Sequence, residues 1–391
     1  MYAKRLSKIA PFRVMELMER ARLLEAQGHR LVHFEVGEPD FPTAEPIARA
    51  GMQAIAEGQT KYTVALGIPE LRQRIAEYYG AMGVTVPWER VVITAGASGG
   101  LMLLNALLLN PGERLLLTDP GYPCNEAFAA LVNSEPVRVV LSADSGFQLS
   151  AEAVSEHWDE RTRGLLLASP ANPTGAIQAR AALTEVVGRV KQLGGFVILD
   201  EIYQGLVYSA APEYRTGLEI DPDVYVLNSF SKYFGMTGWR LGWMVVPEPA
   251  AEPVARLAQN LFISPSAIAQ RAALAAFSDT AMEIHESRRL QFARRRDRLA
   301  EGLQQLGFHL PVIPQGAFYV YADVSSSGMS STDFCWRLIN EYHVAATPGI
   351  DFGDHLADRF VRFAYTTDMG SIELGLERIA AALKAWGAPC S

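Results

Sequence analysis

The sequence predicts an α/β fold in which helices cover both faces of a mainly parallel, seven-stranded sheet, joined to a smaller α+β domain. Two observations lead to this prediction. From residue 68 to about 246, helical stretches alternate with short apolar runs, the pattern of repeated strand-helix-strand units. These runs lack the polar alternation of a half-exposed sheet, so their strands should be buried on both faces.

The expected elements follow the chain in order. An apolar stripe predicts a helix over residues 12–27, followed by a strand at 31–36 and a helix at 46–57. The tail should contain a long helix around the arginine-rich run 288–298, strands at 317–321 and 360–364, a helix near 332–342 and a closing helix. We expect a large domain at 46–280 and a small domain formed by 1–45 plus 281–391. The predicted sheet strands are 91–94, 115–118, 137–141, 165–168, 196–199, 224–227 and 241–246.

Composition excludes several classes of protein. With 49% hydrophobic and 20% charged residues, the 391-residue chain has the makeup of a globular enzyme. Its net charge of -8 argues against a nucleic-acid partner. Cys124, Cys335 and Cys390 form no C-x-x-C pair and predict neither a disulfide framework nor a metal site. Without a signal-peptide core or an apolar run long enough to span a membrane, a cytoplasmic protein is expected.

The strongest chemical signal is Lys232, in the turn that follows a predicted buried strand. Ligands bind beyond the carboxyl ends of such strands. Phe230, Tyr233 and Phe234 flank this lysine and Arg240 lies eight positions on, so desolvation and like charge should favour the neutral amine that attacks carbonyl groups. Lys232 is therefore interpreted as a Schiff-base lysine. The alternative is a lysine that extends its charge to solvent from the strand end.

Other strand ends supply binding groups. Residues 95–100 open a helix with glycine and serine, and its free backbone N–H groups suit a phosphate, although glycines also permit close packing. Tyr122 follows the next strand, either to stack on a planar cofactor or as a simple turn residue. Asn172 lies in a turn that two prolines make rigid. Gly37 could bring its backbone N–H close to a ligand or only form a turn.

Three further residues suggest partners for a cofactor and a substrate. Asp200 ends a buried strand, where a carboxylate needs a partner, and beside a lysine and a phosphate site that partner is a ring cation such as a pyridinium nitrogen. Tyr203 could then donate a hydrogen bond to a neighbouring phenolate. Arg362 is embedded in an apolar strand, where a guanidinium pairs with a carboxylate of the protein or of a substrate.

Together these motifs resemble the class I aminotransferases, pyridoxal-phosphate (PLP) enzymes of fold type I. The resemblance covers nearly the whole chain and implies exchange of an amino group between an L-amino acid and a 2-oxo acid by a ping-pong mechanism. The motifs that carry it are Asn172-Pro173-x-Gly175, Asp200-x-x-Tyr203, Ser229-x-x-Lys232, Gly238-x-Arg240-x-Gly242 and Arg362.

The resemblance also implies a role for each site residue. Lys232 would form the Schiff base and move the proton between Cα and C4′, Asp200 would keep the pyridine nitrogen protonated, and Tyr203 would contact the ring oxygen. Substrate binding is implied for Gly37, Asn172, Arg362 and Phe12. Cofactor binding is further implied for Ala97, Ser98, Tyr122, Asn172, Ser229 and Arg240, and for Tyr62, which would reach the neighbouring subunit of a homodimer.

One departure bears on the substrate. Acid-specific bacterial aspartate enzymes of this subgroup carry a lysine where this chain has Ser98. We therefore expect neutral substrates, with Phe12 and Tyr122 supplying apolar surface. Arg13 is the residue that could still bind an acidic side chain.

Two other functions are compatible with parts of this pattern. A lyase on the same fold, such as a C-S β-lyase or an enzyme resembling aminocyclopropane-carboxylate synthase, would share most of the motifs. A regulator that uses the fold to sense a ligand would need a preceding DNA-binding module, for which residues 1–11 leave no room.

Overall fold

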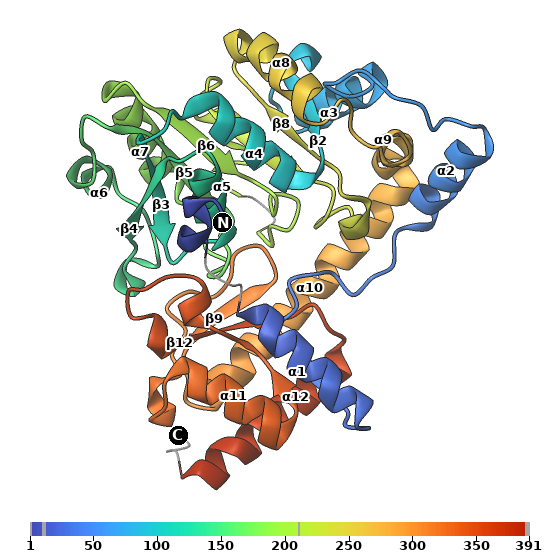
Figure 1. Ribbon diagram of the computed structural model, residues 1–391. Coiled ribbons are helices and arrows are strands. Elements are labelled where there is room, and N and C mark those ends of the chain that lie inside the picture. Colours follow the sequence, from blue (N-terminus) through green and yellow to red (C-terminus); the bar gives the residue numbers. More distant parts are fainter. Residues whose placement is uncertain (1, 10–12, 210–211, 388–391) are drawn as a thin grey trace.

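A seven-stranded sheet forms the centre of the computed structural model, which describes residues 2–9, 13–209 and 212–387 (Figure 1). The strand order is β2-β8-β7-β6-β5-β3-β4. Each of the seven predicted runs forms a strand, so the predicted fold class is confirmed. The strands are β2 (Val91–Thr94), β3 (Arg114–Asp119), β4 (Glu135–Val140), β5 (Thr162–Ala168), β6 (Phe196–Asp200), β7 (Tyr225–Ser229) and β8 (Gly242–Val245).

One strand runs against the others, and this matters for the site. Strands β3 to β7 pair in parallel, whereas β8 is antiparallel to both β2 and β7. The first residue of β8, Gly242, therefore pairs with Ser229 at the end of β7. As a result, the segment before β8 arrives at the same edge of the sheet as the carboxyl ends of the parallel strands.

The sheet is buried on both faces, as predicted. Alternate residues of β6 belong to different apolar cores: Val197 and Leu199 pack on one face and Ile198 on the other. Strand β4 is the exception, because it lies at the edge of the sheet and Val140 is exposed. The surrounding helices are α3 (Pro69–Ala81), α4 (Gly96–Leu108), α5 (Cys124–Leu131), α6 (Ala151–Glu156), α7 (Arg180–Gln192), α8 (Ala251–Leu261) and α9 (Ala267–Leu274).

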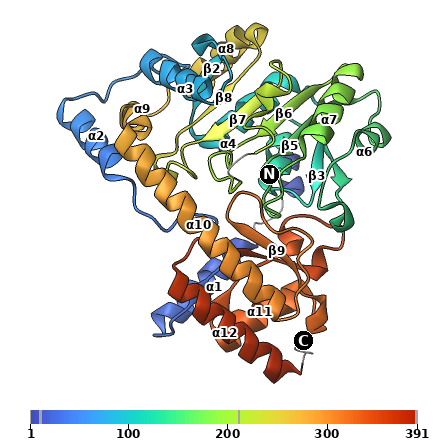
Figure 2. The same cartoon turned by 180° about the vertical axis from the view of Figure 1, so that it is seen from behind.

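A second group of elements, from the two ends of the chain, lies beyond the carboxyl edge of this sheet. The long helix α10 (Asp279–Gln305) connects the two groups (Figures 1 and 2). Helix α2 (Glu45–Ala56) packs against α9. The domain limits themselves stay a prediction. The second group contains β11 (Thr347–Pro348), β12 (Phe360–Ala364) and β9 (Tyr319–Asp323) in one sheet, β1 (Val32–His33) and β10 (Val344–Ala345) in another, and the helices α1 (Val14–Ala26), α11 (Ser331–Tyr342) and α12 (Met369–Trp386).

Two predicted strands have wrong limits. The strand expected at 31–36 is restricted to Val32–His33, because it pairs only with the two residues of β10. The strand expected at 317–321 begins two residues later, because Ala317 has a left-handed backbone with φ of 60° that cannot continue a ladder. The first deviation leaves Glu35 and Val36 in a loop that lines the cavity described next.

Candidate active site

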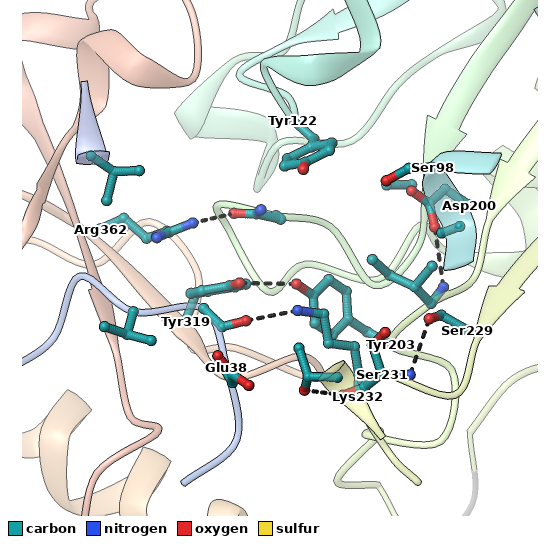
Figure 3. Close-up of a pocket in the computed structure, with 18 of the residues that line it drawn as sticks. Glu38, Ser98, Tyr122, Asp200, Tyr203, Ser229, Ser231, Lys232, Tyr319 and Arg362 are labelled. Atoms are coloured by element: carbon teal, nitrogen blue, oxygen red, sulfur yellow. Dashed lines mark hydrogen bonds between the residues drawn. The ribbon is translucent and has the colours of Figure 1, made fainter. Parts of the chain in front are cut away.

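A cavity of about 310 Å³ opens at the carboxyl edge of the large sheet, between the two groups of elements (Figure 3). It collects side chains from strand ends, from the start of α4, from α1 and from the β9–β12 sheet. Eleven of the predicted site residues line it: Gly37, Ala97, Ser98, Tyr122, Asn172, Asp200, Tyr203, Ser229, Lys232, Arg240 and Arg362.

Two predicted site residues are not among these. Tyr62 lies in the loop after α2, is 81% exposed and does not line the cavity of its own chain. Phe12 lies outside the described residues. Tyr122 and Lys232 lie on opposite sides of the cavity in Figure 3.

Lys232 extends into the cavity, where its Nζ donates a hydrogen bond to the Gly37 carbonyl oxygen at 2.7 Å. Burial lowers the pKa of this lysine to about 8, and the charges of Arg362 and Arg240 act in the same direction, whereas Glu38 opposes them. The amine is therefore neutral in a far larger fraction of molecules than an exposed lysine at the same pH.

The aromatic surroundings of Lys232 differ from the prediction. Its Nζ lies 5.8 Å from the ring centre of Tyr203 and 5.5 Å from that of Phe318. The three sequence neighbours expected to enclose it turn into the core instead: Phe230 and Phe234 pack on Trp243 and Phe277, and Tyr233 donates to Glu286. The lowered pKa was predicted correctly, but the rings beside the amine come from distant segments.

Asp200 is the buried carboxylate of the site. Its Oδ1 accepts a hydrogen bond from the Ile202 N–H at 3.1 Å, and burial raises its pKa to about 6, against the opposing effects of that N–H and of Lys232. The adjacent Glu201 points away and accepts hydrogen bonds from Thr216 and Gly217. Asp200 alone of this pair lines the cavity, and a cation beside it would stabilise the carboxylate.

The start of α4 and Arg240 together have the features of an anion site. Gly96 has φ of +67°, and a Cβ added there would lie 2.8 Å from Nη2 of Arg240, so glycine permits this close approach. The backbone N–H groups of a first helical turn have no partner within the helix, no side chain caps the start of α4, and Ala97 and Ser98 from this turn line the cavity. Ser229 adds a hydroxyl that already accepts from the Ser231 N–H at 3.0 Å.

Arg362 dominates the opposite end of the cavity. It is buried, donates from Nη1 to Asn172 Oδ1 at 3.0 Å and from Nη2 to the Glu35 carbonyl oxygen at 2.8 Å, while Nε has no partner among the described residues. The rings of Tyr319 and Phe352 lie against it, with centres 4.3 and 4.7 Å from the guanidinium carbon. This arrangement holds the guanidinium plane in a fixed orientation.

Sequence reasoning missed Tyr319. Its hydroxyl lies 2.9 Å from the Tyr203 hydroxyl, and a Cβ added to Gly37 would lie 2.4 Å from the same oxygen, which explains the glycine. Nothing in the apolar run that contains it distinguishes this tyrosine from Tyr321 two residues later. The apolar wall from α1 was missed too: it consists of Val14, Met15 and Met18.

Comparison with known proteins identifies the family. The family model for aminotransferases of class I and II matches residues 29–379. This chain belongs to that family. The aminotransferase is 37% identical over 372 residues to valine–pyruvate aminotransferase of Mycobacterium tuberculosis, covering 95% of this chain and 96% of the relative. It is 34% identical to (5-formylfuran-3-yl)methyl phosphate transaminase of Methanocaldococcus jannaschii, covering 97% of this chain and 98% of the relative.

Solved structures agree. A crystal structure of an aminotransferase from Mycobacterium tuberculosis superposes with a TM-score of 0.95 at 37% identity, over 98% of this chain and 99% of that one. Aspartate aminotransferase of Thermus thermophilus with maleate gives 0.91 at 32% identity, over 97% and 99%. The enzyme is a PLP-dependent aminotransferase of fold type I, as the motifs implied, which favours transamination over the lyase alternative.

The site fits this cofactor. A phosphate suits the α4 start with Arg240, and a ring nitrogen suits the buried Asp200 carboxylate, whose hydrogen bond among the described residues comes from the Ile202 N–H. None of the described residues forms a cluster able to hold a metal ion, and no described helix is long and apolar enough to cross a membrane.

Proposed function

We propose that this aminotransferase acts on neutral L-amino acids, with a 2-oxo acid as the acceptor. The observation that carries the proposal is the number of cations in the cavity. Among the described lining residues they are Lys232, Arg240 and Arg362. Each has a task in the chemistry below, so no fourth cation is left for a carboxylate on the substrate side chain.

The wall around the substrate side chain supports the same proposal. Val14, Met15 and Met18 of α1 and Leu101 of α4 contribute apolar surface, and methionines adapt to side chains of different shape. Glu35 and Glu38, also in the lining, would repel an acidic side chain. Burying a leucine-sized side chain is worth about 1.5 to 3 kcal/mol, whereas an unpaired carboxylate costs more than that. The valine–pyruvate name of one relative is in line with this preference.

The proposed roles of the residues follow from where they lie. When bound, PLP supplies the electron sink that transamination needs. Arg362 and Asn172 bind the substrate α-carboxylate, with the Gly37 backbone beside them, and so orient the substrate Cα–H. The neutral amine of Lys232 removes the proton at Cα. The buried Asp200 carboxylate stabilises a protonated ring nitrogen, and the Tyr203 hydroxyl donates to the ring oxygen.

The remaining cofactor contacts are proposed on the same basis. Ala97, Ser98 and Ser229 offer N–H and hydroxyl groups to the phosphate and Arg240 offers its charge, while Tyr122 covers the ring. Phe12 stays a prediction, because it lies outside the described residues. So does a location in the cytoplasm.

A comparison of kcat/KM for aspartate, glutamate, phenylalanine and leucine tests the substrate proposal. We expect leucine or phenylalanine to lead on the wild type and on Arg13→Ala. Arg13 is the exposed cation at the start of α1. The Arg13→Ala variant controls for binding of an acidic substrate side chain by this guanidinium. Ser98→Lys introduces the lysine of the acid-specific enzymes. It should raise kcat/KM for aspartate relative to that for leucine. Aspartate leading on the wild type would overturn the proposal.

We further propose a homodimer in which Tyr62 reaches the neighbouring site. Exposed apolar side chains support it: Tyr62 and Val64 in the loop after α2 are 81% and 58% exposed, and Met52 and Ile55 of α2 are 65% and 57% exposed. Large apolar groups exposed in adjacent segments are typical of an interface.

Complementation between two inactive or weakened variants tests the shared site. Lys232→Ala and Tyr62→Ala each damage both sites of their own homodimer. A mixed dimer regains one site with an intact lysine and an intact partner tyrosine. Activity should therefore rise when the two variants are unfolded and refolded together, and sedimentation should give the mass of a dimer. A monomer, or mixtures no more active than the separate variants, would contradict the proposal.

A further inference from the structure

Two hydroxyls meet across the cavity, and the chemistry described so far uses only one of them. Tyr203 lies in the turn after β6 of the seven-stranded sheet, and Tyr319 is the first residue of β9 in the three-stranded sheet. They lie 2.9 Å apart, and both side chains are buried. Figure 3 shows the pair beside Lys232, between the Arg362 end and the Asp200 end of the cavity.

We propose that Tyr319 is a positioning residue. It directs the hydroxyl of Tyr203 towards the cofactor and links this contact to the binding of the substrate α-carboxylate by Arg362. This inference rests on the proposed roles of Tyr203 and Arg362. In this proposal Tyr319 acts on the reacting groups through Tyr203 and Arg362.

The direction of the hydrogen bond follows from the atoms available. A phenol has one hydrogen to donate and lone pairs to accept. If Tyr203 donates its hydrogen to the cofactor ring oxygen, the hydrogen between the two phenols belongs to Tyr319. Tyr319 then donates to Tyr203, and a phenol that accepts a hydrogen bond is a better donor itself, since successive bonds polarise one another. Among the described residues, the Tyr319 hydroxyl has no other hydrogen-bond partner.

The position of Tyr319 is determined from three sides. Its strand pairs with β12, where Tyr319 lies opposite Ala364 and diagonal to Arg362. The ring centre lies 4.3 Å from the guanidinium carbon of Arg362, within reach for a diagonal pair on one sheet face. The backbone of Gly37 lies against the hydroxyl, with no space for a Cβ. A ring held in this way cannot follow a displaced Tyr203.

Tyr319 therefore contacts both the proposed cofactor-binding phenol, Tyr203, and the proposed carboxylate-binding guanidinium, Arg362. Its ring holds the plane of the guanidinium that binds the α-carboxylate, and its hydroxyl holds the phenol that contacts the cofactor. These two functions separate in one substitution, because Tyr319→Phe keeps the ring over Arg362 and removes only the hydroxyl.

The test measures turnover and the pH-dependent absorbance of the cofactor in the holoenzyme of Tyr319→Phe. We expect kcat to fall about threefold to tenfold, the factor that one ordinary hydrogen bond represents, with KM for the amino acid changed less than about twofold. The midpoint of the absorbance change should move to higher pH. The reason is that a hydrogen bond to the ring oxygen stabilises the deprotonated chromophore, and this bond is weakened.

A double-mutant cycle separates positioning from general loosening. If Tyr319 acts through Tyr203, Tyr319→Phe adds little to Tyr203→Phe in either kcat or midpoint, whereas independent effects would add. Tyr365→Phe is the matched control: it removes another buried hydroxyl, which donates to the Ala317 carbonyl outside the cavity lining. The control should leave the midpoint unchanged.

The possible failures are distinguishable. An unchanged midpoint in Tyr319→Phe, or additive effects in the double variant, would overturn the inference while leaving the proposed function intact. An unchanged midpoint in Tyr203→Phe would instead overturn the proposed role of Tyr203 itself.

Discussion

The two sides of the cavity are built in different ways. The proposed cofactor side comes from one sheet, where Asp200 ends β6, Ser229 ends β7 and Lys232 follows in the next turn. The substrate side is assembled from separate segments of the chain. Arg362 of β12 donates to the carbonyl of Glu35, which lies 327 positions away, and α1 contributes the apolar wall.

Because of this difference, catalysis and substrate specificity should depend on different parts of the fold. Hydrogen bonds between neighbouring strands hold the cofactor side, so its geometry depends on the core of the large sheet. The substrate side depends on how the end segments pack on one another. Substitutions on the cofactor side should therefore remove catalysis, whereas substitutions on the substrate side should change which molecule is bound and how tightly.

The largest effect is expected from Lys232→Ala on the cofactor side. Turnover should fall by about 10⁴-fold, the upper end of what acid–base catalysis contributes, because the base at Cα is lost. The phosphate and ring contacts remain, so the variant should still bind PLP without a covalent bond, as absorbance after dialysis would show. Lys191→Ala, at an exposed lysine paired with Asp221, is the control. Wild-type-like turnover, or borohydride fixing the cofactor to another residue, would rule out the assignment.

Asp200→Ala should come next. Most activity should be lost while the cofactor still attaches to Lys232, because the carboxylate stabilises charge on the ring and does not itself react. Absorbance spectra and turnover measured on the same preparation check both parts. Activity within about threefold of wild type would assign only ~0.6 kcal/mol to this contact and would contradict the proposed role.

Arg362→Lys moves the comparison to the substrate side. The charge is kept, but the planar fork that lies against the rings of Tyr319 and Phe352 is lost. KM should rise about 10- to 100-fold for both the amino acid and the oxo acid, as expected for a charged hydrogen bond, with free amines affected least. Arg359→Lys, three residues earlier and paired with Asp323, is the control. Unchanged KM values for both substrates would contradict the proposed binding of the α-carboxylate.

The smallest effect should concern the attachment of α1. His33 lies between Glu35, at 2.8 Å, and Glu25 of α1, at 3.1 Å. The hydrogen bond that the His33 ring donates to the Glu35 carboxylate raises the pKa of His33 to about 9, against the opposing effect of burial. A raised pKa stabilises the fold fully below the unfolded value of 6.5, and this contribution is lost as the pH rises through about 9.

Unfolding by denaturant between pH 6 and 10 measures this contribution. His33→Gln should flatten the decline in the free energy of unfolding over that range while leaving kcat nearly unchanged, since the histidine does not line the cavity. If the free energy of unfolding declines with pH equally in wild type and variant, a group other than His33 causes the decline.

The sequence alone determined most of the cofactor side. Continuous apolar runs identify buried parallel strands, and polar residues directly after such runs must meet at one edge of the sheet, so Lys232 and Asp200 were predicted from local pattern. Burial alone also predicts the lowered pKa of a lysine in that turn. These conclusions need only the residues near each position.

Tertiary structure decided what local pattern does not encode. The rings of Tyr203 and Phe318 lie near Lys232 because distant segments pack there, whereas its neighbour Phe230 turns into the core. Tyr319 is one tyrosine in an apolar run until β9 pairs with β12 and brings it over Arg362. The physical reason is that periodicity reports which side of an element is buried, while the identity of the partner depends on how elements far apart in the sequence pack together.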